Sequence, residues 1–380
     1  MEMLRSHRIA PPMKPAYLGI LCLLTAGISI WAGLRAVRTD DDFVGIYAAA
    51  QLAGTGHLFD ADRITRLEAN YQPVPHSLPF LRLPIYAFLC KPLTRLPYPM
   101  ARLFWALLNL AAMIAGVLLW PAGSKWAKAF VLCSYPFVYN LILGQDTGIF
   151  LLVAIVSCRL LGKNRNWAAG CLLSLCAIKF HLALLLPLAL IAKRRRAAAC
   201  GATGGILALV ALSSVEGMDW PIRELRSIQG ERIGPAEMPT FFGFSVWFRG
   251  HELIETLLGI SLAVLVYWIA QRSTNMWPVM AAALAGGLLV SHHAYLYDAV
   301  VLMPLLLLTL ESGRGRWVAA ILISPLCYVW RPTALVHPFL WPLIQFLILS
   351  GVIALLVYIE VTRASQQLDA VPVPVGTEAC

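Results

Sequence analysis

Residues 339–359 read FLWPLIQFLILSGVIALLVYI, an apolar run without a charged side chain. A helix needs about 20 such residues to cross the hydrocarbon core of a bilayer. Only a structure that satisfies its own backbone groups is stable there, so a run of this kind forms a helix. Comparable apolar runs cover Ala16–Ala36 and Ile254–Ala270. The sequence therefore predicts an all-α protein that crosses a membrane many times.

The composition agrees with a membrane protein and argues against binding to nucleic acid. Hydrophobic residues make up 59% of the 380 residues and charged residues 13%, whereas soluble domains are nearer half and a quarter. The formal net charge of +10 comes from basic residues scattered in short loops, as the positive-inside rule expects, without a basic stripe carrying interleaved aromatic residues. The nine cysteines are odd in number and form no CxxC pair, so we expect neither a disulfide framework nor a zinc site.

Apolar runs and loop charges predict about twelve transmembrane helices. The segment Leu78–Pro97 contains four prolines, and we expect it to lie on the surface or re-enter, since a span there would move Lys193–Arg196 to the outer side. The pair of weak spans within Trp167–Ala192 has two alternatives, one long bent helix or a hairpin in the outer leaflet. The expected spans are Ala16–Ala36, Met100–Trp120, Ala127–Leu143, Thr147–Leu161, Trp167–Ile178, His181–Ala192, Ala197–Ser213, Leu253–Ala270, Met276–Val290, Leu296–Leu310, Trp317–Val329 and Phe339–Ile359.

This threading places both termini in the cytoplasm and the longest loops outside. We expect a cytoplasmic tail over residues 1–15, a membrane domain over 16–361 and a disordered cytoplasmic tail over 362–380. The first apolar run is interpreted as a retained helix because it is long for a signal peptide and no cleavage site follows it. Most acidic residues fall in or beside the two long outer loops, 37–99 and 215–250. Long loops of mixed charge commonly carry function, so we expect helices lying along the outer surface and a site there.

The three aspartates Asp40-Asp41-Asp42 come directly after the first apolar run. Phe43, Tyr47 and Ala50 follow at the spacing of one helical face, so an amphipathic helix begins here. One interpretation is capping, because a carboxylate at this position satisfies free backbone N–H groups and favours the helix dipole. The other interpretation is that one aspartate is a general base at the membrane surface. The spacing leaves both open.

Two polar breaks in apolar sequence are further candidates for substrate binding. Gly144-Gln145-Asp146 is either a tight turn or a place where Gln145 meets a substrate. Lys179, in Lys179-Phe180-His181, lies deep in apolar sequence, where an ionisable group is costly and usually faces a partner or a polar cavity. The alternative for this lysine is snorkelling to the interface. At the outer surface it could hold a phosphate.

A dense polar stretch, Ser291-His292-His293-Ala294-Tyr295-Leu296-Tyr297-Asp298, occupies an expected outer helix junction. Adjacent histidines do not share a helix face and no metal motif fits, so we expect no metal here. Arg331 opens a short outer loop and either meets lipid headgroups or clamps a phosphate. The substrate-binding candidates of the polar stretch are His292, His293, Tyr297 and Asp298.

The order and spacing of these motifs resemble glycosyltransferase family 87, over roughly residues 16–310. Where relatives have Lys-Pro, this chain has Lys179-Phe180, and His292 stands where a proline commonly follows the serine. The matching features are Asp42-Phe43 with Tyr47 and Gly56, then Pro84, Pro92-Leu93 and Leu96-Pro97 before Trp105 and Asn109, then Gly144-Gln145, Gly170 and Lys179, and finally Tyr297-Asp298.

The resemblance implies a GT-C type fold in the plasma membrane and a hexosyltransferase active on the outer face. Such enzymes take a sugar from a polyprenyl-phosphate carrier and transfer it to a lipid or glycan acceptor. In the mannosyltransferases that this chain resembles, the sugar is mannose. This chemistry needs a carboxylate for the acceptor hydroxyl and cations for the departing phosphate. Asp42 fits the first role, while Lys179, His292 or His293, and Arg331 fit the second. No cofactor is implied, and a single base implies inversion; Asp41 or Asp298 acting as a nucleophile would give retention instead.

Two other classes of protein compete with a transferase. A transporter or flippase of lipid-linked glycans tends to show internal repeats and charges at mid-membrane, and the sequence shows no repeat. A structural membrane subunit would not need the outer acidic and histidine clusters. The transferase is therefore our prediction from the sequence.

Overall fold

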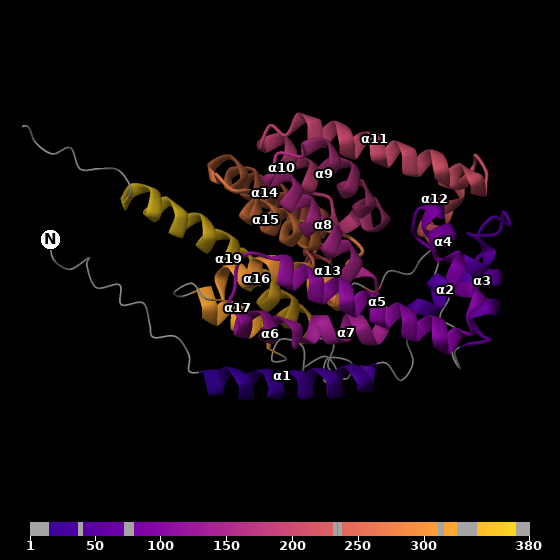
Figure 1. Cartoon of the computed structure of the whole chain (residues 1–380), viewed down its shortest axis with the longest axis horizontal. Coiled ribbons are helices and arrows are strands. Elements are labelled where there is room, and N and C mark those ends of the chain that lie inside the picture. Colours follow the sequence, from indigo (N-terminus) through magenta and orange to yellow (C-terminus); the bar gives the residue numbers. More distant parts are fainter. Residues whose placement is uncertain are drawn as a thin grey trace, which may run out of the picture.

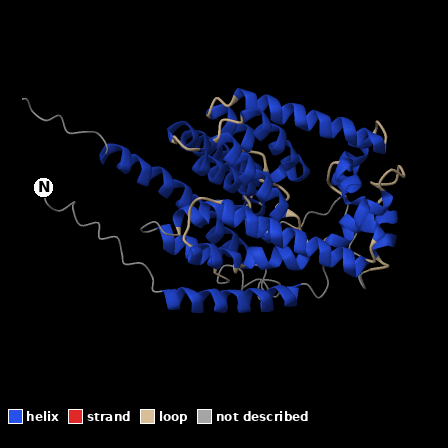
Figure 2. Ribbon diagram, in the orientation of Figure 1, coloured by secondary structure: helices blue, strands red, loops and turns tan. Residues whose placement is uncertain are grey.

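The computed structural model describes residues 15–36, 41–71, 80–230, 234, 238–310, 315–324 and 340–369. Throughout this part of the chain the regular elements are helices, and no strand occurs among them (Figure 2). The predicted all-α class is confirmed.

The helices follow one another with short connections. The 3₁₀ helices are η1 (Lys91–Arg95), η2 (Ser174–Leu182), η3 (Ser214–Glu216) and η5 (Leu296–Leu302). The α-helices are α1 (Pro15–Ala36), α2 (Phe43–Leu52), α3 (Ala61–Glu68), α4 (Pro84–Cys90), α5 (Tyr98–Leu119), α6 (Lys125–Leu132), α7 (Tyr135–Leu143), α8 (Thr147–Gly162), α9 (Asn166–Leu173), α10 (Leu186–Ala192), α11 (Arg196–Ser213), α12 (Trp220–Gly230), α13 (Phe241–Ser245), α14 (His251–Arg272), α15 (Met276–Val290), α16 (Met303–Thr309), α17 (Gly315–Ile323) and α19 (Leu340–Asp369).

Four of the described helical segments are long and apolar enough to cross a membrane: Tyr98–Leu119, Arg196–Glu216, His251–Arg272 and Pro342–Ile359. Each coincides with a span expected from the sequence. A fifth candidate is the pair α6 and α7, which is bent by 46° at its break. The expected span Ala16–Ala36 corresponds to the 22-residue α1, and other expected spans correspond to shorter helices, such as the 16-residue α8 and the 15-residue α15. Length and composition therefore support four or five spans.

The shorter helices form the interior of the bundle. Almost every residue of α15 is buried, and this helix contacts α14, α10, α8, α16 and α19. A helix that is apolar on all sides belongs in a core, because no side needs water. The long helices α5, α11 and α14 instead expose large apolar side chains such as Leu103, Leu207 and Leu257. Those faces are the ones suited to contact lipid.

Small residues bring helices into close contact in this interior. A Cβ on Gly287 of α15 would lie 2.1 Å from the carbonyl oxygen of Leu182, and one on Gly170 of α9 would lie 2.0 Å from that of Ala198. Membrane helices use such small residues because packing, rather than a hydrophobic effect, drives their association. The contact at Gly287 fixes the end of η2, the segment that carries Lys179.

The helices of the two long connecting segments gather at one end of the molecule. Helices α2, α3, α4 and α12 lie together at the right of Figure 1, beside the ends of α5 and α11. Glu216 connects this end to α11, because its carboxylate accepts the N–H groups of Gly54 and Leu58 at 2.7 and 3.3 Å. The helix predicted after Asp42 is confirmed as α2, but its predicted amphipathic character is wrong, because eight of its ten residues are buried.

The structure also tests what was expected for Leu78–Pro97 and for the C-terminal segment 362–380. Leu78–Pro97 contains α4 and η1, which are 7 and 5 residues long and too short to span. At the other end of the chain, α19 continues past the expected boundary at residue 361 to Asp369. The added residues include Ala364, Gln366 and Leu368, which favour helix, so the disorder expected for 362–380 does not begin at its first residue.

Candidate active site

The start of α2 separates the roles of Asp41 and Asp42. Asp42 stands at the N-cap position but makes no capping hydrogen bond with its side chain. Asp41 supplies that bond instead, since its Oδ1 accepts the N–H of Phe43 at 3.2 Å. The capping interpretation therefore holds for Asp41, and the carboxylate of Asp42 is available for another function.

Asp41 also anchors α5 to the end of α7. Arg102 of α5 pairs with its carboxylate at 3.0 Å and donates to the carbonyl oxygens of Leu141 and Ile142 at 3.1 and 2.7 Å. The last carbonyl groups of a helix lack partners within the helix, so an arginine here completes its C-terminus. The N–H of Asp42 donates to Leu143 at 2.9 Å and continues the same junction. These contacts place Asp42 directly beside the Gly144-Gln145-Asp146 turn.

Gly144 makes this turn possible. Its φ of 73° lies in the left-handed region, and a Cβ there would lie 2.7 Å from the Cβ of Phe43. Its carbonyl oxygen accepts the indole N–H of Trp105 at 2.8 Å. The predicted turn is confirmed, and it directs Gln145 and Asp146 toward the interior.

We expect Gly144→Ala to lower the thermal unfolding midpoint of the purified protein more than Gly56→Ala does. Both glycines have positive φ, 73° and 75°, but a Cβ on Gly56 meets nothing within 4 Å. The conformational cost is shared, on the order of 1–3 kcal/mol. The difference between the two variants therefore reports the clash with Phe43. Equal midpoints would show that the junction relaxes freely and does not fix the position of Gln145.

Lys179 is the centre of a buried polar cluster. It is 4% exposed and interrupts η2 with a non-helical backbone at φ −119° and ψ 59°. Its Nζ donates to Gln145 Oε1 at 2.9 Å, Thr147 Oγ1 at 2.8 Å and Asp298 Oδ1 at 2.7 Å. An ammonium group has three donors, so these contacts use all of them. The predicted partner of this lysine is therefore Asp298, and the bend occurs although phenylalanine replaces the proline of relatives.

Asp298 is held as firmly as Lys179. It is 1% exposed, and Thr147 donates to its Oδ1 at 2.7 Å while the N–H of Tyr295 donates to Oδ2 at 3.2 Å. A buried carboxylate with two neutral donors and a cation is stabilised in its charged form. Such a group suits the framework of a site better than proton transfer.

A second cation, Arg82, enters the cluster from the segment before α4. Its guanidinium pairs with Asp146 and lies 4.8 Å from the ring centroid of Tyr86. Tyr86 also donates its hydroxyl to Asp146, and Lys179 Nζ lies 3.3 Å from the other oxygen of that carboxylate. Arg82 is 14% exposed, so it lies nearer the surface than Lys179. The cluster thus combines two cations with Asp146 and Asp298.

Gln145 connects the cluster to Asp42. Its amide accepts from Lys179 through Oε1 and donates through Nε2 to Asp42 Oδ2 at 2.6 Å. These two bonds orient the amide, because the ammonium can bond only to its oxygen. Asp42 is half-buried, whereas Asp146 and Asp298 are buried. Asp42 is therefore the carboxylate of this group that a substrate can reach.

His293 and Tyr297 border the same cluster. The His293 ring lies 5.7 Å from that of His181 and 5.4 Å from that of Tyr295, and Lys179 Nζ lies 5.6 Å from the Tyr297 ring centroid. Burial lowers the pKa of His293 below the ordinary value for histidine. A neutral imidazole carries one donor and one acceptor, so His293 suits hydrogen bonding to a substrate.

His292 points to a different place from its neighbour. It is 62% exposed, pairs with Glu255 of α14 and stacks on Phe242 with ring centroids 4.8 Å apart. The structure thus brings Asp42, Gln145, Lys179, His293, Tyr297 and Asp298 together but directs His292 to another pocket. Arg331 lies outside the described residues, as does Asp40.

Arg82 and Asp146 are the members of the cluster that the sequence did not single out as site residues. Asp146 belongs to the polar break at Gly144-Gln145-Asp146, and Arg82 lies in the proline-containing segment Leu78–Pro97. A signal existed for Arg82, because Tyr86 follows four residues later and Pro84 begins a helix between them. The partner of that arginine, 64 residues away, could not be read from the sequence.

Comparison with known proteins identifies the family. The model of glycosyltransferase family 87 matches residues 80–297, which include Arg82, Gln145, Lys179, His293 and Tyr297. No curated protein and no solved structure matches the chain. Because the matched region covers more than half of the 380 residues, the chain belongs to glycosyltransferase family 87.

Proposed function

We propose that this protein transfers a hexose, mannose in the first instance, from a polyprenyl-phosphate sugar to a lipid or glycan acceptor at the outer face of the plasma membrane. Asp42 is the general base, and the anomeric centre inverts. The observation that carries the proposal is the chain of contacts from Asp42 through Gln145 to Lys179 and Asp298. It joins a reachable carboxylate to a buried cationic cluster, which is the pairing that this reaction needs.

Each part of the reaction has a residue suited to it. The acceptor hydroxyl gives its proton to Asp42 while its oxygen attacks the anomeric carbon. The bond from that carbon to the phosphate oxygen breaks, and polyprenyl phosphate leaves with the electron pair. Negative charge grows on the phosphate, so cations and hydrogen-bond donors nearby lower the barrier. Arg82 and His293 are placed to contact that phosphate, with Arg331 as a further candidate from the sequence.

Lys179 positions neighbouring side chains of the site and does not contact the phosphate. Its three donors are already used by Gln145, Thr147 and Asp298. Its charge still contributes to the local field, which is strong in a site with little water. Lys179 also holds the amide of Gln145, and that amide positions the carboxylate of Asp42.

A panel of sugar donors tests the proposal. Purified protein in lipid nanodiscs receives radiolabelled polyprenyl-phosphate mannose, polyprenyl-phosphate glucose, GDP-mannose or UDP-glucose, with a membrane lipid extract as acceptor. We expect label to enter the lipid fraction from a polyprenyl-phosphate donor and not from a nucleotide sugar. Transfer from a nucleotide sugar alone would refute the lipid-linked donor.

The proposed arrangement in the membrane has about twelve spans with both termini in the cytoplasm. Residues 16–361 form the membrane domain, and loops 37–99 and 215–250 face outward together with Asp42. The support is the distribution of charge, since short loops carry Lys163, Lys193 and Arg272 while acidic residues gather near α2 and α12. A flippase would need none of the contacts between Asp42 and Gln145.

Cysteine labelling tests this orientation. In a cysteine-free background, an impermeant thiol reagent applied to intact cells should modify Asp62→Cys and spare Lys163→Cys. Both positions are exposed, so accessibility within the protein does not separate them. Labelling of Lys163→Cys alone would reverse the orientation and move Asp42 to the cytoplasmic side.

A further inference from the structure

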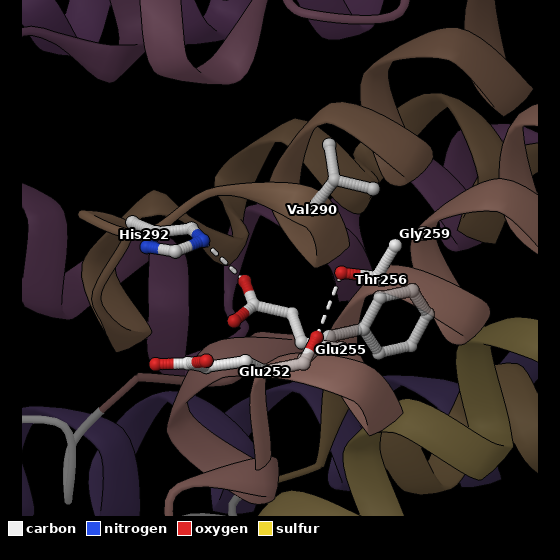
Figure 3. Close-up of a pocket in the computed structure, with 7 residues that line it drawn as sticks. Glu252, Glu255, Thr256, Gly259, Val290 and His292 are labelled. Atoms are coloured by element: carbon white, nitrogen blue, oxygen red, sulfur yellow. Dashed lines mark hydrogen bonds and ion pairs between the residues drawn. The ribbon is translucent and has the colours of Figure 1, made fainter. Parts of the chain in front are cut away.

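A cavity borders the Ser291–Tyr295 segment at His292. Its volume is about 350 Å³, within the range of small-molecule sites. It opens between α13, the first two turns of α14 and the end of α15 (Figure 3). The side chains of Phe241, Glu252, Glu255, Thr256 and His292 line the cavity, and Gly259 leaves space at the far end.

Acceptors of hydrogen bonds dominate the polar lining. Glu255 directs its carboxylate to His292, and Glu252 presents its own carboxylate from the turn before (Figure 3). The Thr256 hydroxyl donates to the carbonyl oxygen of Glu252 at 2.7 Å. His292 is fixed by Glu255 and by stacking on Phe242. The cavity therefore has one acidic side, formed by Glu252 and Glu255, and one aromatic side, formed by Phe241 and His292.

This cavity is lined by two carboxylates, whereas the cluster around Lys179 contains two cations that pair with Asp146 and Asp298. Two carboxylates repel a phosphate, so the donor is unsuited to this place. They accept hydrogen bonds from several hydroxyl groups, and charged acceptors make such bonds short and strong. A sugar supplies many hydroxyl donors and no negative charge. Its chemistry therefore matches the cavity.

The adjacent face of α14 shows where the rest of such a ligand would lie. Glu252, Glu255 and Gly259 follow one face of the helix, while Leu253 and Leu257 on the next face are 65% and 56% exposed. Both faces belong to a candidate membrane span. A molecule with a sugar head and an acyl tail can thus place its head in the cavity and its tail along the leucines.

We propose that this cavity binds the sugar headgroup of a glycolipid acceptor, and this rests on the proposed function. Glu252 and Glu255 accept hydrogen bonds from the sugar hydroxyls, with His292 holding Glu255 in place. His292 and His293 are consecutive, so their Cα atoms are about 3.8 Å apart. The segment that carries them therefore borders both the acceptor cavity and the cluster that contains Lys179 and Asp298. The carboxylates of the cavity suit the hydroxyl groups of the acceptor, and the cations of the cluster suit the phosphate of the donor.

Photolabelling tests the proposal without requiring turnover. The probe is an octyl mannoside with a diazirine beside the sugar, added to the protein in nanodiscs free of sugar detergents. A matched probe carries phosphocholine on the same chain. We expect the mannoside to label the peptides around Glu255 and His292, and excess decaprenyl phosphate not to displace it. Equal labelling by phosphocholine, or displacement by decaprenyl phosphate, would overturn the assignment.

Two variants and one control sharpen the result. Glu252→Gln with Glu255→Gln should lower mannoside labelling about tenfold, because charge-assisted hydrogen bonds become neutral ones. Gly259→Leu should lower mannoside labelling because the leucine side chain fills the cavity. Folding should be preserved, since a Cβ at Gly259 meets nothing within 4 Å. Glu224→Gln, outside the cavity, should label as the wild type does. Wild-type labelling in both cavity variants would overturn the proposal.

The outcome is separable from that of the proposed function. Specific mannoside labelling without transfer from any polyprenyl-phosphate donor keeps the sugar site and rejects the donor. Transfer that proceeds with no label in the cavity keeps the function and rejects this site. A fall in kcat for Glu255→Gln, with unchanged KM for the acceptor, would assign Glu255 to chemistry and overturn its binding role.

Discussion

Asp42→Asn is expected to reduce kcat by about 10²–10⁴-fold, the usual contribution of a general base. Asparagine keeps the shape of the side chain but cannot take the proton of the acceptor hydroxyl. Folding should be little changed, because Asp41 rather than Asp42 caps α2. Donor binding should also be retained, since the cations of the cluster are intact. The measurement is steady-state transfer together with the thermal unfolding midpoint.

Asp41→Asn is the matched control at the neighbouring position. It weakens the ion pair with Arg102 at 3.0 Å and the hydrogen bond from Tyr98 at 2.6 Å, so its main effect should be on stability. We expect a lower unfolding midpoint with measurable turnover per folded molecule. Near-normal turnover in Asp42→Asn, or loss of turnover only in Asp41→Asn, would move the base away from Asp42.

Lys179→Met should have the second large effect, on stability and turnover together. It leaves Asp298 buried without its cation, and removing one partner of a buried ion pair costs about 3–5 kcal/mol. It also frees the Gln145 amide that orients Asp42. Thermal unfolding in detergent and a transfer assay measure the two losses. If Lys179 served only to bind phosphate, turnover would fall while the unfolding midpoint stayed unchanged.

The double variant Lys179→Met with Asp298→Asn separates structure from catalysis. Removing both charges avoids an uncompensated carboxylate, so part of the lost stability should return. Turnover should stay low, because the amide of Gln145 is still released. A double-mutant cycle gives the coupling between the two residues, and purely additive effects on stability would contradict the ion pair.

Much of this site could be predicted from residues that are out of place in apolar sequence. Lys179 lies deep in an apolar segment, so a buried partner was expected, and Gly144 marked a turn. The spacing of Phe43 and Tyr47 predicts that a helix begins at Phe43, so Asp42 comes directly before its first residue. These inferences use local physical rules, and the structure confirms each of them.

Other features depend on contacts between distant parts of the chain. Capping by Asp41 rather than Asp42 follows from the junction with Arg102 and α7, which no local pattern reveals. The same holds for the divergence of His292 and His293, since the partner of His292 is Glu255 on another helix. The number of spans was also beyond the sequence, because apolar runs of 15 or 16 residues predict a span and a buried core helix equally well.

The most direct test of one-step transfer with Asp42 as the base is the anomeric configuration of the product. Wild-type protein is given a polyprenyl-phosphate sugar of known anomer, and the new linkage is assigned by NMR from its anomeric coupling constants. A single displacement at the anomeric carbon predicts a product of the opposite configuration to the donor. A product of the same configuration would require two displacements and a carboxylate nucleophile, and would contradict the role proposed for Asp42.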